Sequence, residues 1–251
     1  FHGRSSAGIA ATASENMTKG FGPLLPGFIN INLNDHETIK TTVSEKTAAI
    51  LIEPIQGEGG IRVLPEPFLK EIRAICDEKN ILLILDEVQC GVGRSGKLFA
   101  HEWVEIEPDI MMVAKGIGGG FPLGAVLAKE NAASGMTAGT HGSTYGGNPL
   151  GCSIGLKVMD IISDPNFLYD VNRKAKLFHD GLLELLRKNT SIFEEVRGKG
   201  LMLGLKCKVK NIDVVNAAYS NKLLTVPAGD NVVRLLPPLT ISDKDINEAL
   251  N

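Results

Sequence analysis

The chain has 251 residues, of which 43% are hydrophobic, enough for one large domain or for a large and a small one. Its 26 basic and 29 acidic side chains give a net charge of −3, and with no long basic run this argues against a nucleic-acid or anionic-membrane partner. No apolar stretch is long enough to span a bilayer. The four cysteines (Cys76, Cys90, Cys152 and Cys207) form no CxxC pair, so we expect reduced, buried or semi-buried thiols of a cytoplasmic protein.

The first half of the chain alternates short apolar runs with one amphipathic segment. Residues 47–53 (TAAILIE) predict a strand, residues 65–80 predict a helix, and residues 81–87 (ILLILDE) predict a second strand, in the order of a βαβ unit. Two more strands are predicted at residues 109–114 (DIMMVA) and 124–128 (GAVLA). Wholly apolar runs are typical of strands buried on both faces. We therefore predict an α/β fold with a mostly parallel central sheet flanked by helices.

The second half predicts two long helices followed by a smaller α+β region. The helices cover residues 148–163 and 166–189, and Asp164-Pro165 between them is expected to break the first. Short strands are predicted in residues 194–207, 223–227 and 231–238, with a helix near 212–221 and a final helix at the end of the chain. We therefore expect a large domain at residues 1–164, and a long linking helix with a small C-terminal domain at 165–251.

Two of the predicted strands end abruptly in charged residues. Asp86 ends the run ILLILD, and Lys115 follows the next run, DIMMVA, directly before the glycine-rich GIGGG. In open parallel sheets, ligands bind beyond the carboxyl ends of the strands. An acid and an amine placed there suit pyridoxal phosphate, which needs a lysine for its Schiff base and a carboxylate beside its ring nitrogen. A purely structural ion pair at the sheet edge is the alternative on spacing alone.

Six blocks along the chain resemble the class III (omega-amino) aminotransferases, pyridoxal-phosphate enzymes of fold type I. They are FHGRS (1–5), EPIQGEGG (53–60), DEVQCGVGRSG (86–96), AKGIGGGFPLGA (114–125), THGSTYGGNPLG (140–151) and NVVRLLPPL (231–239). Two of the blocks depart mildly from the family pattern. FHGRS and GVGRSG carry serine where many relatives carry threonine, which leaves a hydroxyl available.

The resemblance assigns five residues to the cofactor ring. Lys115 is expected to hold the cofactor as an imine and, once released, to move a proton. Asp86 is expected to keep the pyridine nitrogen protonated, and Gln89 to hydrogen-bond the ring hydroxyl. Val88 and Phe1 are expected to cover the two ring faces. Ordinary core packing of Val88 and Phe1, and a surface position for Gln89, are the alternatives.

The block HGSTYGGNPLG supplies a glycine-rich loop ahead of a helix. Its Ser143 and Thr144 have hydroxyls and backbone amides suited to a phosphate. The resemblance implies that Thr144 reaches the cofactor phosphate of a neighbouring subunit, and therefore that the protein is a homodimer with a shared active site. The alternative is that Thr144 merely orders the turn.

Three further residues are candidates for substrate binding. Arg4 resembles an arginine that binds a substrate carboxylate, for which a planar guanidinium is suited. Arg234 stands in the apolar stretch VVRLLPP, where an unpaired charge is costly. The resemblance implies that Arg234 binds the 2-oxoglutarate carboxylate and that Glu58 covers it otherwise. A permanent structural salt bridge is the alternative.

The implied activity is transfer of the terminal amino group of N-acetylornithine to 2-oxoglutarate, a step of arginine biosynthesis. Ornithine or another omega-amino acid is the alternative donor. In the family a Ser-Gly-x-Glu-Ala phosphate loop precedes these blocks, so we expect this chain to be part of a longer protein, with a catalytically incompetent fragment as a further alternative. A nicotinamide-dependent oxidoreductase would need a glycine-rich strand-to-helix turn that is not found. The histidines have no metal-binding spacing, so no metal site is expected.

Overall fold

The computed structural model describes residues 5–12 and 14–251, which form two compact units divided between Thr47 and Ala48. The first unit contains three short helices, α1 (Ser6–Ala11), α2 (Glu15–Thr18) and α3 (His36–Thr42). Asp35 caps α3, because its Oδ1 accepts a hydrogen bond of 2.9 Å from the backbone N–H of Thr38. All remaining elements belong to the second unit.

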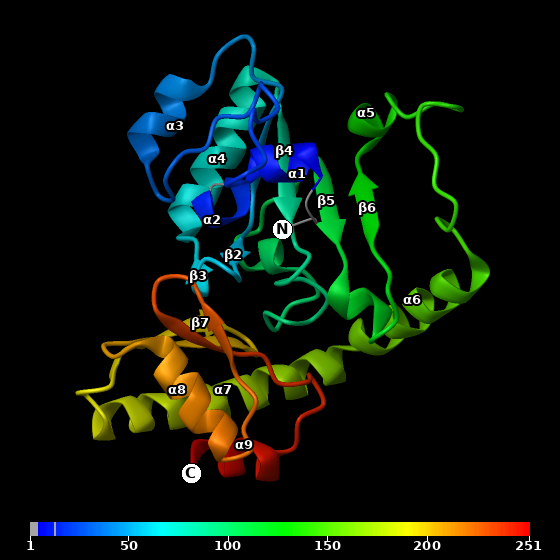
Figure 1. Ribbon diagram of the computed structural model, residues 1–251. Coiled ribbons are helices and arrows are strands. Elements are labelled where there is room, and N and C mark those ends of the chain that lie inside the picture. The colour runs from blue at the N-terminus through cyan, green and yellow to red at the C-terminus, as the bar shows by residue number, and fades with distance from the viewer. Residues whose placement is uncertain (1–4, 13) are drawn as a thin grey trace. The chain divides into compact units, whose positions relative to one another are not determined.

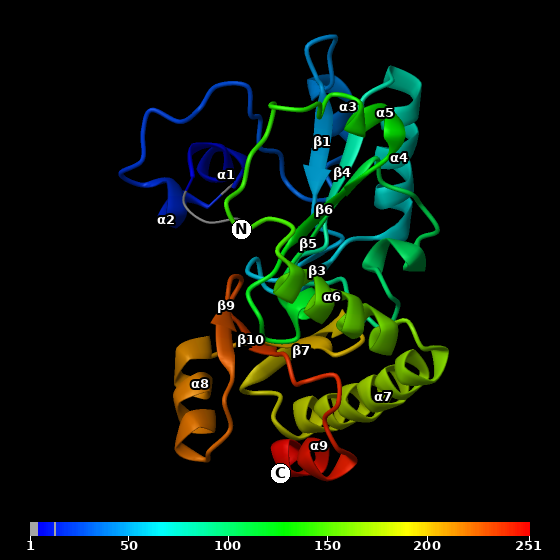
Figure 2. The ribbon, with the colours of Figure 1, turned by 90° about the vertical axis from the view of Figure 1, so that its right-hand side faces the viewer.

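A four-stranded sheet organises the first part of the second unit (Figures 1 and 2). Its strands are β1 (Ala49–Ile52), β4 (Leu82–Asp86), β5 (Ile110–Val113) and β6 (Ala125–Ala128), in that spatial order. The first three strands are parallel, and β6 runs antiparallel to β5. The short β2 (Ile55–Gln56) and β3 (Arg62–Val63) pair separately as an antiparallel ribbon after β1.

Helix α4 (Glu66–Lys79) connects the β2–β3 ribbon to β4 and completes the predicted βαβ unit. It packs against β1 and β4 and buries Phe68, Leu69, Ile72 and Cys76, which recur at helical spacing. Asn80 ends the helix in the left-handed region (φ 52°), which asparagine tolerates better than most residues. The 3₁₀ turns η1 (Ala100–Trp103) and η2 (Lys115–Gly118) and helix α5 (Glu130–Ala133) lie in the connections that follow.

The two predicted long helices are α6 (Pro149–Ile162) and α7 (Pro165–Lys188). The dipeptide Asp164-Pro165 does more than end α6, because it also begins α7. Pro165 is the first helical residue, where its missing N–H costs nothing. Asp164 Oδ1 accepts a hydrogen bond of 2.8 Å from the N–H of Asn166 and so caps the new helix.

A second four-stranded sheet, wholly antiparallel, forms the C-terminal part. It consists of β7 (Phe193–Lys199), β8 (Met202–Cys207), β10 (Val232–Leu235) and β9 (Val226–Ala228), in that order. Helices α7 and α9 (Asp243–Leu250) pack on each other, and α8 (Asn211–Ser220) contacts β9 and β10 (Figure 2). The shared core includes Val171, Phe178, Leu182, Leu203, Leu205, Val233 and Ile246.

These elements confirm the predicted fold class, a mixed, mainly parallel sheet flanked by helices, with an α+β region after it. The expected domain boundary at 164–165 coincides with the start of α7 and stays a prediction. Cys76, Cys90 and Cys207 are buried, but Cys152 is exposed, against expectation. The reason is local, since α6 turns Gly151 and Gly155 inward and Cys152 away from that face.

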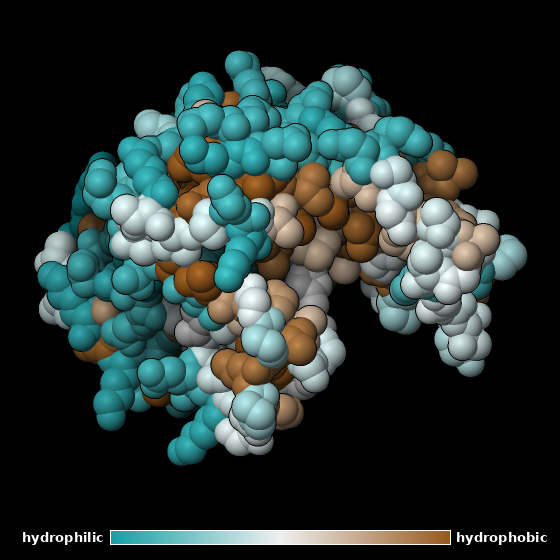
Figure 3. Space-filling model, turned by 90° about the horizontal axis from the view of Figure 1, so that it is seen from above, coloured by the Kyte–Doolittle hydropathy of each residue, from teal (hydrophilic) through white to brown (hydrophobic). Residues whose placement is uncertain are grey.

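Several large apolar side chains remain on the surface. Every residue of β6 is exposed, with Val126 at 69% and Leu127 at 45%. Figure 3 shows hydrophobic surface in the middle of the view, below a region of hydrophilic side chains. Among the described residues, no helix combines the length and the apolar character needed to cross a membrane.

Candidate active site

Asp86 and Lys115 lie at the same edge of the first sheet. Asp86 is the last residue of β4 and is paired in register with Met112 of β5, and Lys115 follows shortly after β5 ends at Val113. Because β4 and β5 are parallel, both side chains belong to the carboxyl ends of neighbouring strands. Asp86 is buried, whereas Lys115 is exposed and has a left-handed backbone (φ 47°). Such strain in a residue other than glycine is typical of functional sites.

Asp86 and its neighbour Glu87 serve different parts of the molecule. Glu87 is fully buried, and its carboxylate accepts hydrogen bonds from the backbone N–H groups of Ala100 and His101 at the start of η1. It also lies 2.8 Å from Nδ1 of His101. Asp86 Oδ1 accepts a bond of 3.0 Å from the N–H of Val88. Glu87 therefore anchors the scaffold, and Asp86 is the carboxylate that lies at the carboxyl end of β4 itself.

Glu53 is a further acidic group at this edge that the sequence reasoning did not select. It directly follows β1, which is the parallel neighbour of β4. Burial, and next the Asp86 carboxylate, raise the pKa of Glu53, while a hydrogen bond of 3.3 Å from the N–H of Gly57 opposes that rise. Its position at a third parallel strand end was the signal that could have identified it.

Glu58 and Arg234 form an ion pair between distant parts of the chain. Arg234 Nη1 lies 2.7 Å from Glu58 Oε1 and donates a second bond of 3.0 Å to Gln89 Oε1. Arg234 is 6% exposed, while the Glu58 side chain is 54% exposed. Nε of Arg234 is buried without a hydrogen-bond partner among the residues that the structure describes. A buried guanidinium with an unused N–H is suited to bind another carboxylate.

Gln89 connects the segment of Asp86 with the ion pair of Glu58 and Arg234. It follows Asp86 by three positions, and its amide packs so closely on Gly57 that a Cβ there would collide with it. The structure pairs its Oε1 with Arg234, so the expected hydrogen bond to the cofactor ring stays a prediction. Val88, the other ring contact predicted on this segment, is partly buried.

The predicted phosphate residues lie on the loop before α6. Ser143 and Thr144 are both exposed, and Ser143 Oγ accepts a bond of 2.9 Å from the N–H of Gly146. Asn148 Oδ1 caps α6 through the N–H of Gly151, at 2.8 Å. Their role toward a phosphate stays a prediction. The two remaining predicted residues, Phe1 and Arg4, lie outside the described residues.

The arrangement fits an aldehyde cofactor with a basic ring nitrogen. Lys115 offers an accessible amine, and Asp86 offers a buried carboxylate on the adjacent strand end. The glycine-rich turn after Lys115 borders open space, since a Cβ at Gly120 would meet no atom within 4 Å. Within residues 5–12 and 14–251, no group of three His, Cys, Asp or Glu side chains could hold a metal ion.

Known proteins similar to this chain are described as aminotransferases. Acetylornithine aminotransferase of Rhodobacter capsulatus is 65% identical over 250 residues, which are all of this chain and 64% of that protein. An ornithine aminotransferase structure from Toxoplasma gondii, with partial occupancy of pyridoxal phosphate at its active site, matches with a TM-score of 0.94 and 32% identity. That match covers 100% of this chain and 60% of the other. The N-acetylornithine aminotransferase structure from Stenotrophomonas maltophilia has a TM-score of 0.81 and 36% identity, over 89% of this chain and 60% of that one.

The family comparison covers the whole sequence. The model of aminotransferase class-III matches residues 1–251. The chain spans 64% of the Rhodobacter capsulatus relative, slightly less than two thirds of its length. Together, the strand-end acid and amine, the fold and the family match establish that this chain belongs to the class-III aminotransferases.

Proposed function

We propose that the protein containing this chain transfers the terminal amino group of N-acetylornithine to 2-oxoglutarate with pyridoxal phosphate as cofactor. The observation that carries this proposal is the placement of Asp86 and Lys115 at the carboxyl ends of adjacent parallel strands. The 65% identity to an acetylornithine aminotransferase supports the choice of donor.

Each residue has a defined task in the proposed reaction. Pyridoxal phosphate, when bound, supplies the aldehyde that takes up the amino group and the ring that withdraws electrons. Lys115 Nζ would hold the cofactor through its aldehyde carbon, and once free, the amine would carry a proton between the substrate carbon and that cofactor carbon. Asp86 accepts a hydrogen bond from the protonated ring nitrogen and holds it protonated. Ser143 and Thr144 donate to the phosphate.

Three residues select the substrate in each half-reaction, namely Arg4, Glu58 and Arg234. Arg4 binds a substrate carboxylate in both. Glu58 covers Arg234 while the amine donor is bound, as supported by their contact of 2.7 Å. When 2-oxoglutarate arrives, Glu58 turns away and the carboxylate of 2-oxoglutarate takes its place at Arg234 Nη1.

The proposal extends to assembly and cellular role. We infer a homodimer in which Thr144 of each subunit reaches the cofactor phosphate of the other. Exposed apolar residues in the segment from β6 to α6 support an interface there: Val126, Leu127, Met136, Tyr145, Leu150, Leu156 and Ile161. We also infer a cytoplasmic step of arginine biosynthesis as the role, and the relatives named acetylornithine aminotransferase support the reaction itself.

A direct test combines a spectrum with a chemical label. Added pyridoxal phosphate is expected to give a visible imine band, and borohydride reduction followed by peptide mapping is expected to place the label on Lys115. Lys115→Ala removes the band while non-covalent binding of the cofactor stays detectable. Lys129, the residue between β6 and α5, provides the control substitution, Lys129→Ala, which is expected to keep the band. A label on any lysine other than Lys115 would refute the assignment.

Ornithine is the second candidate donor, favoured by the TM-score of 0.94 with an ornithine aminotransferase. Half-reactions with N-acetylornithine and ornithine, followed by loss of the imine band, separate the two candidates. A faster reaction with N-acetylornithine supports the main proposal, and a faster reaction with ornithine replaces it.

A further inference from the structure

The contact between Glu58 and Arg234 depends on two segments that are far apart in sequence. Glu58 belongs to residues 57–61, here called the Glu58 loop, which follows β2. Arg234 lies on β10, and this strand begins directly after residues 229–231, here called the Asp230 turn. The distance between the two side chains is therefore set by how the Glu58 loop docks on the Asp230 turn.

The two segments touch through their backbones. The N–H of Gly229 donates a hydrogen bond of 2.8 Å to the carbonyl of Glu58. A Cβ at Gly229 would lie 3.0 Å from that carbonyl oxygen, and a Cβ at Gly60 would lie 3.1 Å from the Cβ of Asp230. This close approach leaves little room for the two segments to slide past each other. Any group that holds them together therefore also fixes the backbone position of Glu58.

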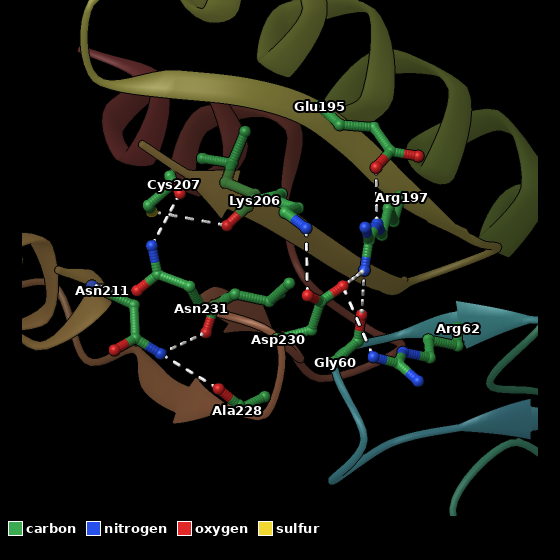
Figure 4. Close-up of polar contacts among 12 residues, drawn as sticks. Gly60, Arg62, Glu195, Arg197, Lys206, Cys207, Asn211, Ala228, Asp230 and Asn231 are labelled. Atoms are coloured by element: carbon green, nitrogen blue, oxygen red, sulfur yellow. Dashed lines mark hydrogen bonds and ion pairs between the residues drawn. The ribbon is translucent and has the colours of Figure 1, made fainter. Parts of the chain in front are cut away.

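The carboxylate of Asp230 contacts positively charged side chains both from the strand that follows the Glu58 loop and from the C-terminal sheet (Figure 4). Its Oδ2 lies 2.6 Å from Arg197 Nη1 and 3.6 Å from Arg62 Nη2, and its Oδ1 lies 2.9 Å from Lys206 Nζ. Arg62 follows the Glu58 loop on β3, whereas Arg197 and Lys206 belong to β7 and β8. Arg197 Nη1 also donates a bond of 3.3 Å to the carbonyl of Gly60, inside the Glu58 loop.

The Asp230 turn is itself fixed to the small sheet. Asn231 Nδ2 donates to the carbonyls of Cys207 and Val209, at 2.6 and 2.7 Å, and its Oδ1 accepts a bond of 2.8 Å from the N–H of Asn211. These contacts let the sheet serve as a rigid support against which Asp230 holds the loop (Figure 4).

The backbone on both sides is strained. Ile61 (φ 49°), Asp230 (φ 54°) and Asn231 (φ 56°) all lie in the left-handed region, which is costly above all for the β-branched Ile61. Strain of this kind persists only where the surrounding contacts determine the conformation. Without the carboxylate, Arg62, Arg197 and Lys206 would also repel one another.

We propose that Asp230 is a positioning residue that holds the Glu58 loop against the Asp230 turn and thereby sets the contact between Glu58 and Arg234. This inference rests on the proposed function of that pair, and it adds a residue that touches neither substrate nor cofactor. Loss of the Asp230 charge frees the loop, so Glu58 covers Arg234 less well and discrimination between the amine donor and 2-oxoglutarate weakens.

The test compares Asp230→Asn with Asp243→Asn in the full chain carrying pyridoxal phosphate. Asp243 pairs with Arg173 at 2.8 Å, so its substitution breaks a similar ion pair away from the loop. Asp230→Asn is expected to change the ratio of the two half-reaction rate constants by roughly 2- to 30-fold, in the direction of Glu58→Gln. Asp243→Asn leaves the ratio unchanged, and Asp230→Glu restores part of it. An unchanged ratio in Asp230→Asn overturns the inference.

Amide hydrogen exchange provides a readout that does not need catalysis. Asp230→Asn is expected to accelerate exchange at residues 57–61 and at Gly229, and Asp243→Asn is not. If the wild-type protein shows no half-reaction, the proposed function fails, while this measurement still decides whether Asp230 holds the loop. If Asp230→Asn does not fold, Arg62→Gln, at a side chain 46% exposed, tests the loop side of the cluster. Equal exchange in Arg62→Gln and the wild type then overturns the inference.

Discussion

At the scale of single residues, two adjacent carboxylates at the end of β4 have separate tasks. Asp86 lies at the strand-end site and accepts a hydrogen bond from the N–H of Val88, while Glu87 accepts hydrogen bonds from the N–H groups of Ala100 and His101. The sequence pattern accounts for this separation, because consecutive strand residues point to opposite faces. It could not predict what Glu87 binds, since η1 lies on a later connection whose path no local pattern specifies.

Substitution of Asp86 tests its proposed role. Asp86→Asn is expected to lower the transamination rate by several orders of magnitude, because a neutral amide does not stabilise a protonated ring nitrogen. Asp86→Glu, which keeps the charge, is expected to be milder. Rates of both half-reactions measure the effect, and near-normal activity of Asp86→Asn would contradict the role.

The pair Glu58 and Arg234 is expected to behave differently in the two half-reactions. Arg234→Ala mainly slows the reaction with 2-oxoglutarate, because the guanidinium that binds its carboxylate is removed. Glu58→Gln mainly weakens discrimination, because Arg234 is then uncovered when the amine donor binds. Single-turnover rates with each substrate are the measurement. Equal losses in both half-reactions for both variants indicate a static salt bridge instead.

At the scale of elements, local sequence predicted most helices and strands within a few residues. The apolar runs of β1, β4 and β5 and the spacing in α4 are strong signals, since burial on a sheet or on one helix face requires them. The start of α7 at Pro165 was less well predicted, because Asp-Pro both ends one helix and caps the next. The contact of the Glu58 loop with the Asp230 turn is long-range, and no local pattern indicates it.

The turn between β7 and β8 is expected to depend on Gly200. Its φ is 60°, and a Cβ there would lie 2.6 Å from the carbonyl oxygens of Arg94 and Ser95. Gly200→Ala is therefore expected to cost roughly 2–4 kcal/mol in the free energy of unfolding. Gly139→Ala is the control, since Gly139 also has positive φ (87°) but no atom within 4 Å, and it costs about 1–2 kcal/mol. Urea unfolding measures both, and equal costs would contradict the close contact.

The Asp230 cluster is expected to make stability sensitive to acid. Hydrogen bonds first from Arg197 and then from Lys206 lower the pKa of Asp230 from 3.8 to about 2. A lowered acid pKa stabilises the fold above the ordinary value, and this contribution is lost as the pH falls from about 4 to about 2. In Asp230→Asn, the free energy of unfolding is therefore expected to fall less steeply as the pH decreases from about 4 to about 2. A wild-type pH slope of the unfolding free energy in Asp230→Asn would contradict this role of the carboxylate.

At the scale of the whole molecule, the proposed shared site predicts complementation between subunits. A Lys115→Ala subunit mixed with a Thr144→Ala subunit is expected to restore one intact site per heterodimer, because each defect then falls in the same site of the pair. Activity is compared between the mixture and each variant alone. A fully active monomer, or a mixture no more active than its components, contradicts the shared site.

The attachment of the Glu58 loop to the Asp230 turn determines which motion uncovers Arg234, and therefore how fast. The backbone of Glu58 is tied through its carbonyl to Gly229, while its side chain is 54% exposed. Uncovering Arg234 therefore needs only rotation about side-chain bonds, which takes picoseconds to nanoseconds at exposed positions. Typical enzymes complete about 10 turnovers per second. Under the proposed function, alternation between the two substrates therefore adds no delay to the catalytic cycle, because uncovering Arg234 requires no movement of a loop or a domain.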